Sequence, residues 1–372
     1  DGITWNSDNA IRRDGATFVF ANNAAVRFSA AADETGSETG IKGIQLIFAD
    51  GTTSGGYDAE TASFTQPAAI RETKTIQAIR VFYGETEIRV AQLADPAEKL
   101  EGLKIVVDKK APTPELALEE AHANDYYNKD FTVKVNGIND PDDYSGIQSV
   151  EYWVVKDRTE TEQGTETQRE MLYTYTEGGD ILQELEGLSF IVDAGKNNSD
   201  NVVIYVQVTD RAGNVYTMPQ AVKVNSTPPT IEIKFGKEGE EGEEKPVNVV
   251  KENGTERGYY DAVRTATVTI TDRASTRDLD AVKFDIKAKD AAGNDVSNTV
   301  TISDWVKGDT GEPSCDVTFS GDANYIWSIS YTNRAGLSAK AGLSALADKD
   351  QTKSVNAVTY GETPYCFTVD KN

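Results

Sequence analysis

Apolar and polar residues alternate along most of the chain with the period of two that half-buried β-strands show. One spacing of apolar positions occurs three times, at 41–48, 147–154 and 279–286. Clusters of Asp, Asn, Gly and Ser, such as Asp-Arg-Ala-Gly-Asn at 210–214, separate the apolar runs and favour turns. The pattern predicts short strands joined by turns, and only the alanine- and leucine-rich stretch after Leu337 favours a short helix.

A proline-containing segment recurs at the ends of apolar runs. Val-Asp-Lys-Lys-Ala-Pro-Thr at 107–113 returns as Val-Asn-Ser-Thr-Pro-Pro-Thr at 224–230. It begins again as Val-Asp-Lys-Asn at 369–372, which predicts a longer array of the same kind. Proline fixes φ, lacks an N–H and pushes the preceding residue into extended backbone, so each copy ends one strand and directs the next. We interpret these segments as joints between domains.

The joints predict domains at 1–110, 111–227 and 228–372, the last with insertions at 237–245 and about 337–360. Repeats of more than a hundred residues indicate tandem domains, because solenoid repeats are only about 20–50 residues long. Many short strands with almost no helical periodicity indicate a sandwich or barrel, and the repeat length is typical of an immunoglobulin-like sandwich. The predicted fold class is all-β: three tandem immunoglobulin-like β-sandwich domains joined by short proline-containing linkers.

Motifs in the second and third repeats carry a resemblance to a known family. Tyr-Tyr opens a strand at 126–127 and at 259–260, Gly-Ile begins the spaced strand at 146–147, and Thr-Val-Thr-Ile-Thr-Asp-Arg occupies 267–273. Together with the Asp-Arg-Ala-Gly-Asn turn, they resemble tandem bacterial immunoglobulin-like repeats of large Gram-positive surface proteins of the adhesin type. The first repeat departs from these motifs. The resemblance implies the sandwich fold and a location outside the cell, secreted or anchored to the cell wall.

The composition narrows the possible partners. The chain of 372 residues carries 61 acidic and 37 basic residues, for a formal net charge of −24. Binding to nucleic acid or to an anionic membrane surface needs clustered Lys and Arg, so neither is expected. No stretch approaches 18 unbroken apolar residues, so membrane insertion is not expected. The expected partners are neighbouring immunoglobulin-like domains of the same chain and, in addition, a host protein or glycan.

Candidate catalytic groups are few. His122 is the only histidine, and it lies in a polar, loop-like stretch, so a Ser-His-Asp triad or a Cys-His dyad would have to use it. Both cysteines lie in a different predicted domain from His122. Acidic residues are too numerous for any pair of them to indicate glycoside hydrolysis. The protein is therefore predicted not to be an enzyme.

Three candidate sites remain. The acidic turn with Asp140, Asp142 and Asp143 could supply oxygen ligands to calcium, although a solvated turn explains it as well, so no cofactor is firmly expected. Cys315 and Cys366 lie in one domain and could form a disulfide or stay as two buried thiols. Trp153 should face away from the core on its strand, where it could stack on a ligand.

The sequence leaves three functions open. The preferred one is a non-catalytic extracellular segment of a bacterial cell-surface protein that acts as a stiff spacer or adhesive stalk. The first alternative is a specific binder of a host ligand such as mucin glycan, a matrix protein or immunoglobulin. The second is an accessory segment of a secreted glycan-active enzyme. Sandwich folds host many unrelated functions, so the fold does not choose among them.

Overall fold

The computed structural model shows an almost entirely β-stranded chain whose strand pairings fall into three separate groups. The structure describes residues 3–6, 10–14, 17–21, 27–32, 41–53, 56–58, 63–65, 72–74, 76–83, 87–92, 104–140, 145–157, 165–166, 168–177, 185–235, 246–252, 255–308, 311–342 and 366–371. No strand pairing within these ranges crosses from one group to the next. We refer to the groups as the N-terminal, middle and C-terminal units.

The N-terminal unit contains three sheets, with strand orders β1-β4-β7-β6, β10-β3-β2 and β5-β8-β9. The strand β10 pairs in parallel with β3 and brings the chain to the end of the unit. The strands are β1 (Ile3–Asn6), β2 (Arg12–Asp14), β3 (Thr17–Phe20), β4 (Arg27–Ala32), β5 (Ile41–Phe48), β6 (Gly56–Asp58), β7 (Ser63–Thr65), β8 (Ile76–Tyr83), β9 (Glu87–Gln92) and β10 (Lys104–Val107).

The middle unit packs a three-stranded sheet, β11-β13-β17, against a six-stranded sheet of order β12-β19-β18-β14-β15, in which β16 also pairs with β14. The strands are β11 (Thr113–Leu118), β12 (Tyr126–Tyr127), β13 (Phe131–Asn139), β14 (Ile147–Lys156), β15 (Thr165–Glu166), β16 (Glu170–Thr174), β17 (Ser189–Val192), β18 (Val202–Asp210) and β19 (Val215–Val224). Residues of both sheets form one buried apolar cluster, which is the core of a sandwich.

The C-terminal unit repeats this plan with a sheet of order β20-β23-β27-β25, to which β26 is added, and a sheet of order β21-β22-β30-β28-β24, to which β29 is added. The elements are β20 (Thr230–Phe235), β21 (Asn248–Glu252), β22 (Thr255–Tyr260), β23 (Arg264–Thr271), the 3-10 helix η2 (Leu279–Ala281), β24 (Lys283–Lys289), the 3-10 helix η3 (Ser297–Thr299), β25 (Val300–Ile302), β26 (Val306–Lys307), β27 (Pro313–Phe319), β28 (Ala323–Thr332), β29 (Ser338–Gly342) and β30 (Cys366–Val369). Its core gathers several aromatic rings around Trp327.

The predicted all-β fold class is confirmed, and the middle and C-terminal units are immunoglobulin-like sandwiches of two sheets. That the N-terminal unit is a third such sandwich stays a prediction. Alternation of buried and partly exposed residues along β18 places Val202, Ile204, Val206 and Val208 in the core. That strand pairs with β14 on one side and β19 on the other, as its β-branched sequence predicts for a central strand. Trp327, on β28 of the C-terminal unit, is also fully buried.

Two local predictions need correction. The apolar spacing at 279–286 begins not as a strand but as the 3-10 helix η2, and β24 starts only at Lys283. The stretch after Leu337 forms the strand β29 (Ser338–Gly342) rather than a helix over those residues. Pairing with β28 and burial of Ala339 and Ala341 outweigh the helix propensity of alanine there. The insertion at 237–245 and the stretch from 343 to 360 lie outside the described residues.

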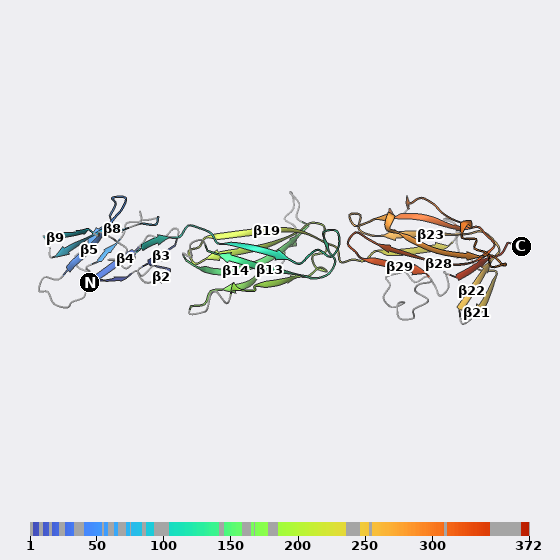
Figure 1. The fold of residues 1–372 in the computed structure, drawn as a ribbon, viewed down its shortest axis with the longest axis horizontal. Helices are drawn as coiled ribbons and strands as arrows, with labels where there is room; N and C mark the ends of the chain where they lie inside the picture. Colours follow the sequence, from blue (N-terminus) through green and yellow to red (C-terminus); the bar gives the residue numbers. More distant parts are fainter. Residues whose placement is uncertain are drawn as a thin grey trace.

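The three units lie end to end along the longest axis of the molecule (Figure 1). We call the chain between β10 and β11, residues 108–112, the first joint, and the chain between β19 and β20, residues 225–229, the second joint. Both fall at the predicted proline-containing segments, whereas the boundaries at residues 110 and 227 stay a prediction. In the described ranges no helix has the length and apolar character needed to cross a membrane.

Candidate cation site at the first joint

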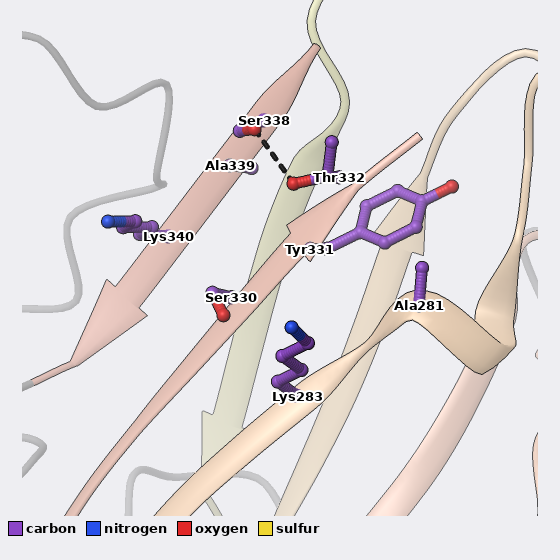
Figure 2. A pocket seen from close by; sticks show the side chains of 8 residues that line it. All are labelled: Ala281, Lys283, Ser330, Tyr331, Thr332, Ser338, Ala339 and Lys340. Atoms are coloured by element: carbon purple, nitrogen blue, oxygen red, sulfur yellow. Dashed lines mark hydrogen bonds between the residues drawn. The ribbon is translucent and has the colours of Figure 1, made fainter. Parts of the chain in front are cut away.

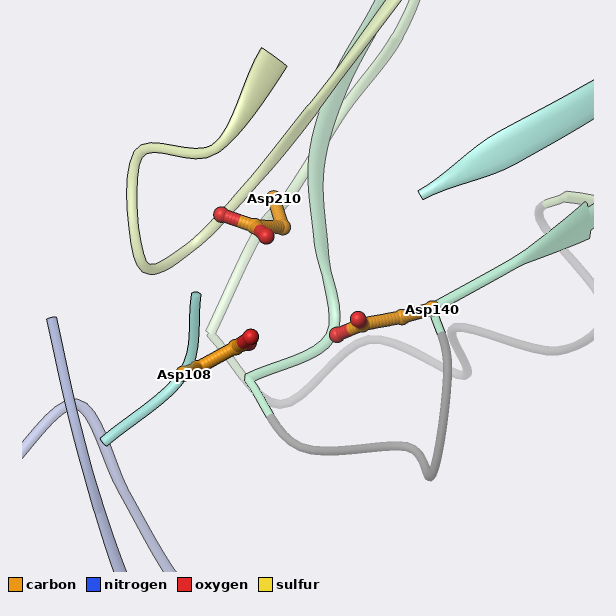
Figure 3. A group of neighbouring side chains, drawn as sticks. All are labelled: Asp108, Asp140 and Asp210. Carbon is orange, nitrogen blue, oxygen red and sulfur yellow. The ribbon is translucent and has the colours of Figure 1, made fainter. Parts of the chain in front are cut away.

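Three aspartates from distant parts of the sequence meet at the first joint. Asp108 follows β10, Asp140 follows β13 and Asp210 ends β18 (Figure 3). One carboxylate oxygen from each lies within 4.8 Å of one from both others. Two oxygens bound to the same calcium ion, each at about 2.3–2.6 Å from it, are separated by no more than about 5 Å. The spacing therefore fits a shared cation.

Hydrogen bonds hold each carboxylate in place. The Asp108 N–H donates to Phe20 O (3.0 Å), and Asp108 Oδ1 accepts from the Lys110 N–H (3.0 Å), so this aspartate is fixed to the N-terminal unit. Asp140 Oδ2 accepts from the N–H groups of Ser145 (3.1 Å) and Gly146 (2.6 Å). The cluster therefore joins one residue of the linker to two strand ends of the middle unit.

Asn214 fixes the third carboxylate and connects it to the first. Its N–H donates to Asp210 Oδ1 (2.7 Å), and its Nδ2 donates to Asp210 Oδ2 (2.8 Å). The same Nδ2 lies 3.4 Å from Asp108 Oδ1 and 3.3 Å from the Asp108 carbonyl oxygen. These donors orient the carboxylates but do not cancel their charge.

The described residues around the cluster supply no counter-charge for its carboxylates. Asp108, Asp140 and Asp210 are 0%, 4% and 1% exposed, respectively. Asp108 Oδ2 and Asp140 Oδ1 have no hydrogen-bond partner among the described residues. Within the same ranges, no lysine or arginine forms an ion pair with any of the three. Buried charge without a counter-charge is strongly unfavourable, so the cluster needs a proton or a cation.

The pKa shifts of Asp140 and Asp210 also indicate that the negative charge of the cluster is poorly compensated. Burial raises the pKa of Asp140 to about 6; the N–H of Gly146 partly offsets this, and the neighbouring charges of Asp108 and Asp210 add to it. Burial likewise raises the pKa of Asp210, while the hydrogen bonds from Asn214 lower it. Both shifts show that the fully ionised cluster is disfavoured as it stands.

In metal-free buffer, we expect the middle unit to lose stability as the pH rises from about 4 to above 6. The pKa of Asp140 is about 6 in the folded chain and 3.8 ordinarily, so the folded state holds the proton more tightly over that window. The groups facing it in the described structure, Asp108 and Asp210, are acidic and act in the same direction. Thermal unfolding of wild type and Asp140→Asn across this range checks the prediction. A difference in unfolding temperature between wild type and Asp140→Asn that stays constant with pH would contradict the prediction.

The second joint holds a hydrogen-bonded version of the same arrangement. Asn225 follows β19, Asp272 follows β23 and Asn333 follows β28, and all three are buried. The N–H of Asn225 donates to Tyr127 O (3.0 Å), as that of Asp108 does to Phe20 O. The turn after Asn333 closes as the turn after Asp210 does, because in each the residue three positions on donates its N–H to the first carbonyl.

Neutral donors satisfy the single carboxylate of the second joint. Asp272 Oδ1 accepts from Asn333 Nδ2 (3.0 Å), and Asp272 Oδ2 accepts from Tyr331 Oη (2.9 Å). Asn225 Nδ2 donates to Thr276 Oγ1 (2.9 Å), which bridges from the middle unit to the C-terminal unit. Two of the three acidic positions of the first joint are thus amides in the second, which balances its polar groups without an ion.

Further hydrogen bonds cross the second joint. Arg273 Nη1 donates to Val224 O (2.8 Å) and to Asp200 Oδ1 (3.1 Å), and its Nη2 contacts Asn198 Oδ1. Asn124 Nδ2 and Asn128 Nδ2 donate to the carbonyl oxygens of residues 334 and 335 (2.8 and 2.7 Å). In the first joint, Arg211 Nη2 donates to Ile11 O (2.6 Å). Both joints are therefore polar contacts rather than free linkers.

The predicted calcium residues are only partly placed. Asp140 lies in the cluster, whereas Asp142 and Asp143 lie outside the described residues. Sequence reasoning did not connect Asp108 or Asp210 with a metal, although each stands in a recurring motif. The available signal was that Asp or Asn occupies all three positions at both joints, namely 108, 140 and 210, and 225, 272 and 333.

In the structure the two cysteines are free and buried, which is the arrangement of the two-thiol alternative and not of the disulfide. Cys315 faces the core of the C-terminal unit together with Val317 and Phe319 on β27. On β30, Phe367 and Val369 face that core, so Cys366 points to the opposite side of its sheet. Burial raises the pKa of the Cys315 thiol to about 12 and also raises that of Cys366, which keeps both unreactive.

Trp153 does not offer a ligand-binding face. It lies outside the core cluster of its unit, as the alternation predicts, but its side chain is only 6% exposed. Tyr205 stacks on one side of the ring at 5.2 Å between centroids, and the guanidinium of Arg169 lies 3.9 Å from the ring centroid. Stacking on a ligand would require these side chains to move.

Two further polar features lie apart from the aspartate cluster. His122 Nδ1 accepts from the N–H of Asn128 (3.0 Å), and burial lowers the pKa of this histidine, so it acts as a local structural acceptor. A small surface pocket lies beside β28 and β29, where Thr332 Oγ1 and Ser338 Oγ are 2.8 Å apart (Figure 2). The pocket also presents the side chains of Lys283 and Lys340.

Comparisons with known proteins give similarity of fold only. No family model and no curated protein matches the chain. A solved structure of a 1.5-MDa bacterial ice-binding adhesin is 12% identical, with a TM-score of 0.37, over 91% of this chain and 94% of the matched chain. A Ca²⁺-stabilised adhesin of an Antarctic bacterium gives the same identity and TM-score over 91% and 72%. Fibronectin(III)-like modules of Clostridium thermocellum CbhA are 12% identical, with a TM-score of 0.24, over 60% and 95%.

Proposed function

We propose that this chain is a non-catalytic spacer in an extracellular bacterial surface protein, a stalk that holds its neighbouring domains in line and at a distance. The observation that carries the proposal is the end-to-end order of the units, with polar contacts across both joints (Figure 1). Strands of about ten residues rise about 33 Å, so three units in line span on the order of 100 Å.

The second joint supplies the physical basis for stiffness. A flexible linker leaves neighbouring domains free to reorient, and here the guanidinium of Arg273 instead donates to three acceptors of the middle unit. Asn225 adds a bond to Thr276, and Asn124 and Asn128 add bonds to the turn at residues 334 and 335. The middle unit is thus bonded to two separate turns of the C-terminal unit, which restricts reorientation more than a single contact would.

Spin labels placed on both sides of the second joint test this proposal. Met171 and Val306 are 56% and 60% exposed, so Met171→Cys and Val306→Cys can be labelled while the native thiols stay buried. We expect one narrow distance distribution from pulsed electron resonance, and a clearly broader one when Arg273→Ala is added. Arg334→Ala is the matched control, because its guanidinium is 3.8 Å from Asp278 of its own unit. A broad distribution in the otherwise wild-type chain would overturn the stiff spacer.

A further inference from the structure

We propose that Asp108, Asp140 and Asp210 bind one calcium ion, which locks the first joint, whereas the second joint is locked without an ion. The observations are the three buried carboxylates within 4.8 Å and the two carboxylate oxygens without partners. Calcium binding itself follows from these side chains alone. The stiffening effect of the ion rests in addition on the proposed spacer function.

The chemistry of the ligands selects the ion. All the donors are carboxylate oxygens, with the carbonyl oxygen of Asp108 beside them, and neither thiols nor imidazoles take part. Oxygen ligands favour calcium, magnesium or manganese over zinc or copper. Calcium accepts six to eight oxygens in irregular geometry, whereas magnesium demands a near-ideal octahedron and gives up its water reluctantly. Carboxylates already fixed by Asn214 and Gly146 suit the more tolerant ion.

The position of the site explains its effect on the joint. Asp108 is bonded through its N–H to Phe20 of the N-terminal unit, while Asp140 and Asp210 belong to the middle unit. A cation shared by all three would therefore fix the start of the linker against two strand ends of the next unit. Without it, mutual repulsion of the carboxylates acts at the same place. Calcium thus replaces repulsion among the three carboxylates by shared coordination, which fixes the first joint.

The second joint provides an internal comparison. Its equivalent positions hold Asn225, Asp272 and Asn333, which leaves one carboxylate, and the described donors satisfy that carboxylate. Such a set offers a single negative charge and amide groups already committed to hydrogen bonds. We therefore expect calcium to bind at the first joint and not at the second.

Isothermal titration of the intact chain with calcium chloride at pH 7.5 and fixed ionic strength tests the site. The expected result is one ion bound per chain, weaker binding of magnesium, and an unfolding temperature raised by about 3 °C or more at saturating calcium. Asp108→Asn should weaken calcium binding more than about tenfold, since changes even to outer-shell groups of metal sites cost about 10–100-fold. Asp280→Asn with Asp285→Asn removes two exposed charges far from the site and should leave binding unchanged.

Thermal unfolding in the presence of a chelator distinguishes variants that have lost a calcium ligand from variants whose fold is damaged. Asp108→Asn places an amide donor where an oxygen has no partner, so in chelator this variant should unfold at or above the wild-type temperature. The double variant Asp108→Asn with Asp210→Asn recreates the residue types of the second joint and should be insensitive to calcium. Absence of binding in wild type at millimolar calcium, or equal binding in these variants, would overturn the site.

Distance measurements across the first joint separate the site from its proposed role. Labels at Gln77→Cys and Met171→Cys, both at exposed positions, report the angle between the N-terminal and middle units. We expect calcium to narrow their distance distribution in wild type and to leave it unchanged in Asp108→Asn. If calcium binds but the distance distribution does not narrow, the calcium site stands and the proposed locking of the first joint is overturned. A broad distribution across the second joint would overturn the spacer function without touching calcium binding.

Discussion

The Trp327→Ala variant is expected to lose about 3–5 kcal/mol of unfolding free energy, the usual range for truncating a large buried aromatic residue. Trp327 is fully buried at the centre of the C-terminal core. Its ring centroid lies 5.4 Å from that of Phe319 and 6.3 Å from that of Phe235. Alanine would remove the transfer free energy of the indole and leave a cavity that neighbouring rings cannot fill without leaving their own contacts.

Calorimetry of the intact chain is the appropriate measurement, because a chain of several units need not unfold in one step. The transition of the C-terminal unit should shift down, and Trp327→Phe should shift it less. Ile204→Ala, at a fully buried position of the middle unit, is the matched control and should move a different transition. If both alanine variants shift every transition together, the units do not unfold separately.

Replacing Asp272 by alanine is expected to destabilise the C-terminal unit by about 3 kcal/mol or more. The carboxylate accepts from Tyr331 Oη (2.9 Å) and Asn333 Nδ2 (3.0 Å), both in buried residues. Removing it leaves those donors without their acceptor, and each buried unsatisfied donor costs about 1–3 kcal/mol. Burial and the hydrogen bond to Asp272 both raise the pKa of the Tyr331 hydroxyl, so it stays a neutral donor.

Asp290→Ala is the matched control for this variant. Asp290 organises a similar turn through the N–H groups of Ala292 (2.9 Å) and Asn294 (2.8 Å), but its side chain is in contact with solvent. Water can replace the lost acceptor there, so the loss should be much smaller. Chemical denaturation of both variants, followed by calorimetry to locate the affected transition, decides the comparison. Equal losses of unfolding free energy in the two variants would show that the buried hydrogen bonds of Asp272 stabilise the fold no more than those of an exposed turn.

The sequence predicts the fold well where one periodicity dominates. The alternation from Val202 to Val208 identifies a central strand, because both neighbouring strands and the core reward the same residues. The proline steps locate the joints for an equally local reason. Local rules fail at Ser338–Gly342, where pairing with β28 decides the conformation, and at Leu279, where a 3-10 turn precedes the strand.

The candidate site was only partly predictable, because its ligands are neighbours in space rather than in sequence. Asp142 and Asp143 are adjacent to Asp140 in the chain, and adjacency alone suggested them. The residues brought together are instead those at three strand ends, 108, 140 and 210. Finding them requires knowing which strand ends share one end of the sandwich. For Trp153, the alternation predicted the correct side of the strand but could not reveal the cover that Tyr205 and Arg169 provide.

The pairing of β11 and β19, where the chain enters and leaves the middle unit, determines how this unit would respond to tension. The chain enters through β11, which pairs antiparallel with β13, and leaves through β19, which pairs with β18 along its length. The middle-unit strands run along the long axis of the molecule (Figure 1). A pull on the two ends would therefore load these ladders in shear, so that many hydrogen bonds share the force at once instead of unzipping singly. Such a unit would extend very little under load until the hydrogen bonds of a ladder break together.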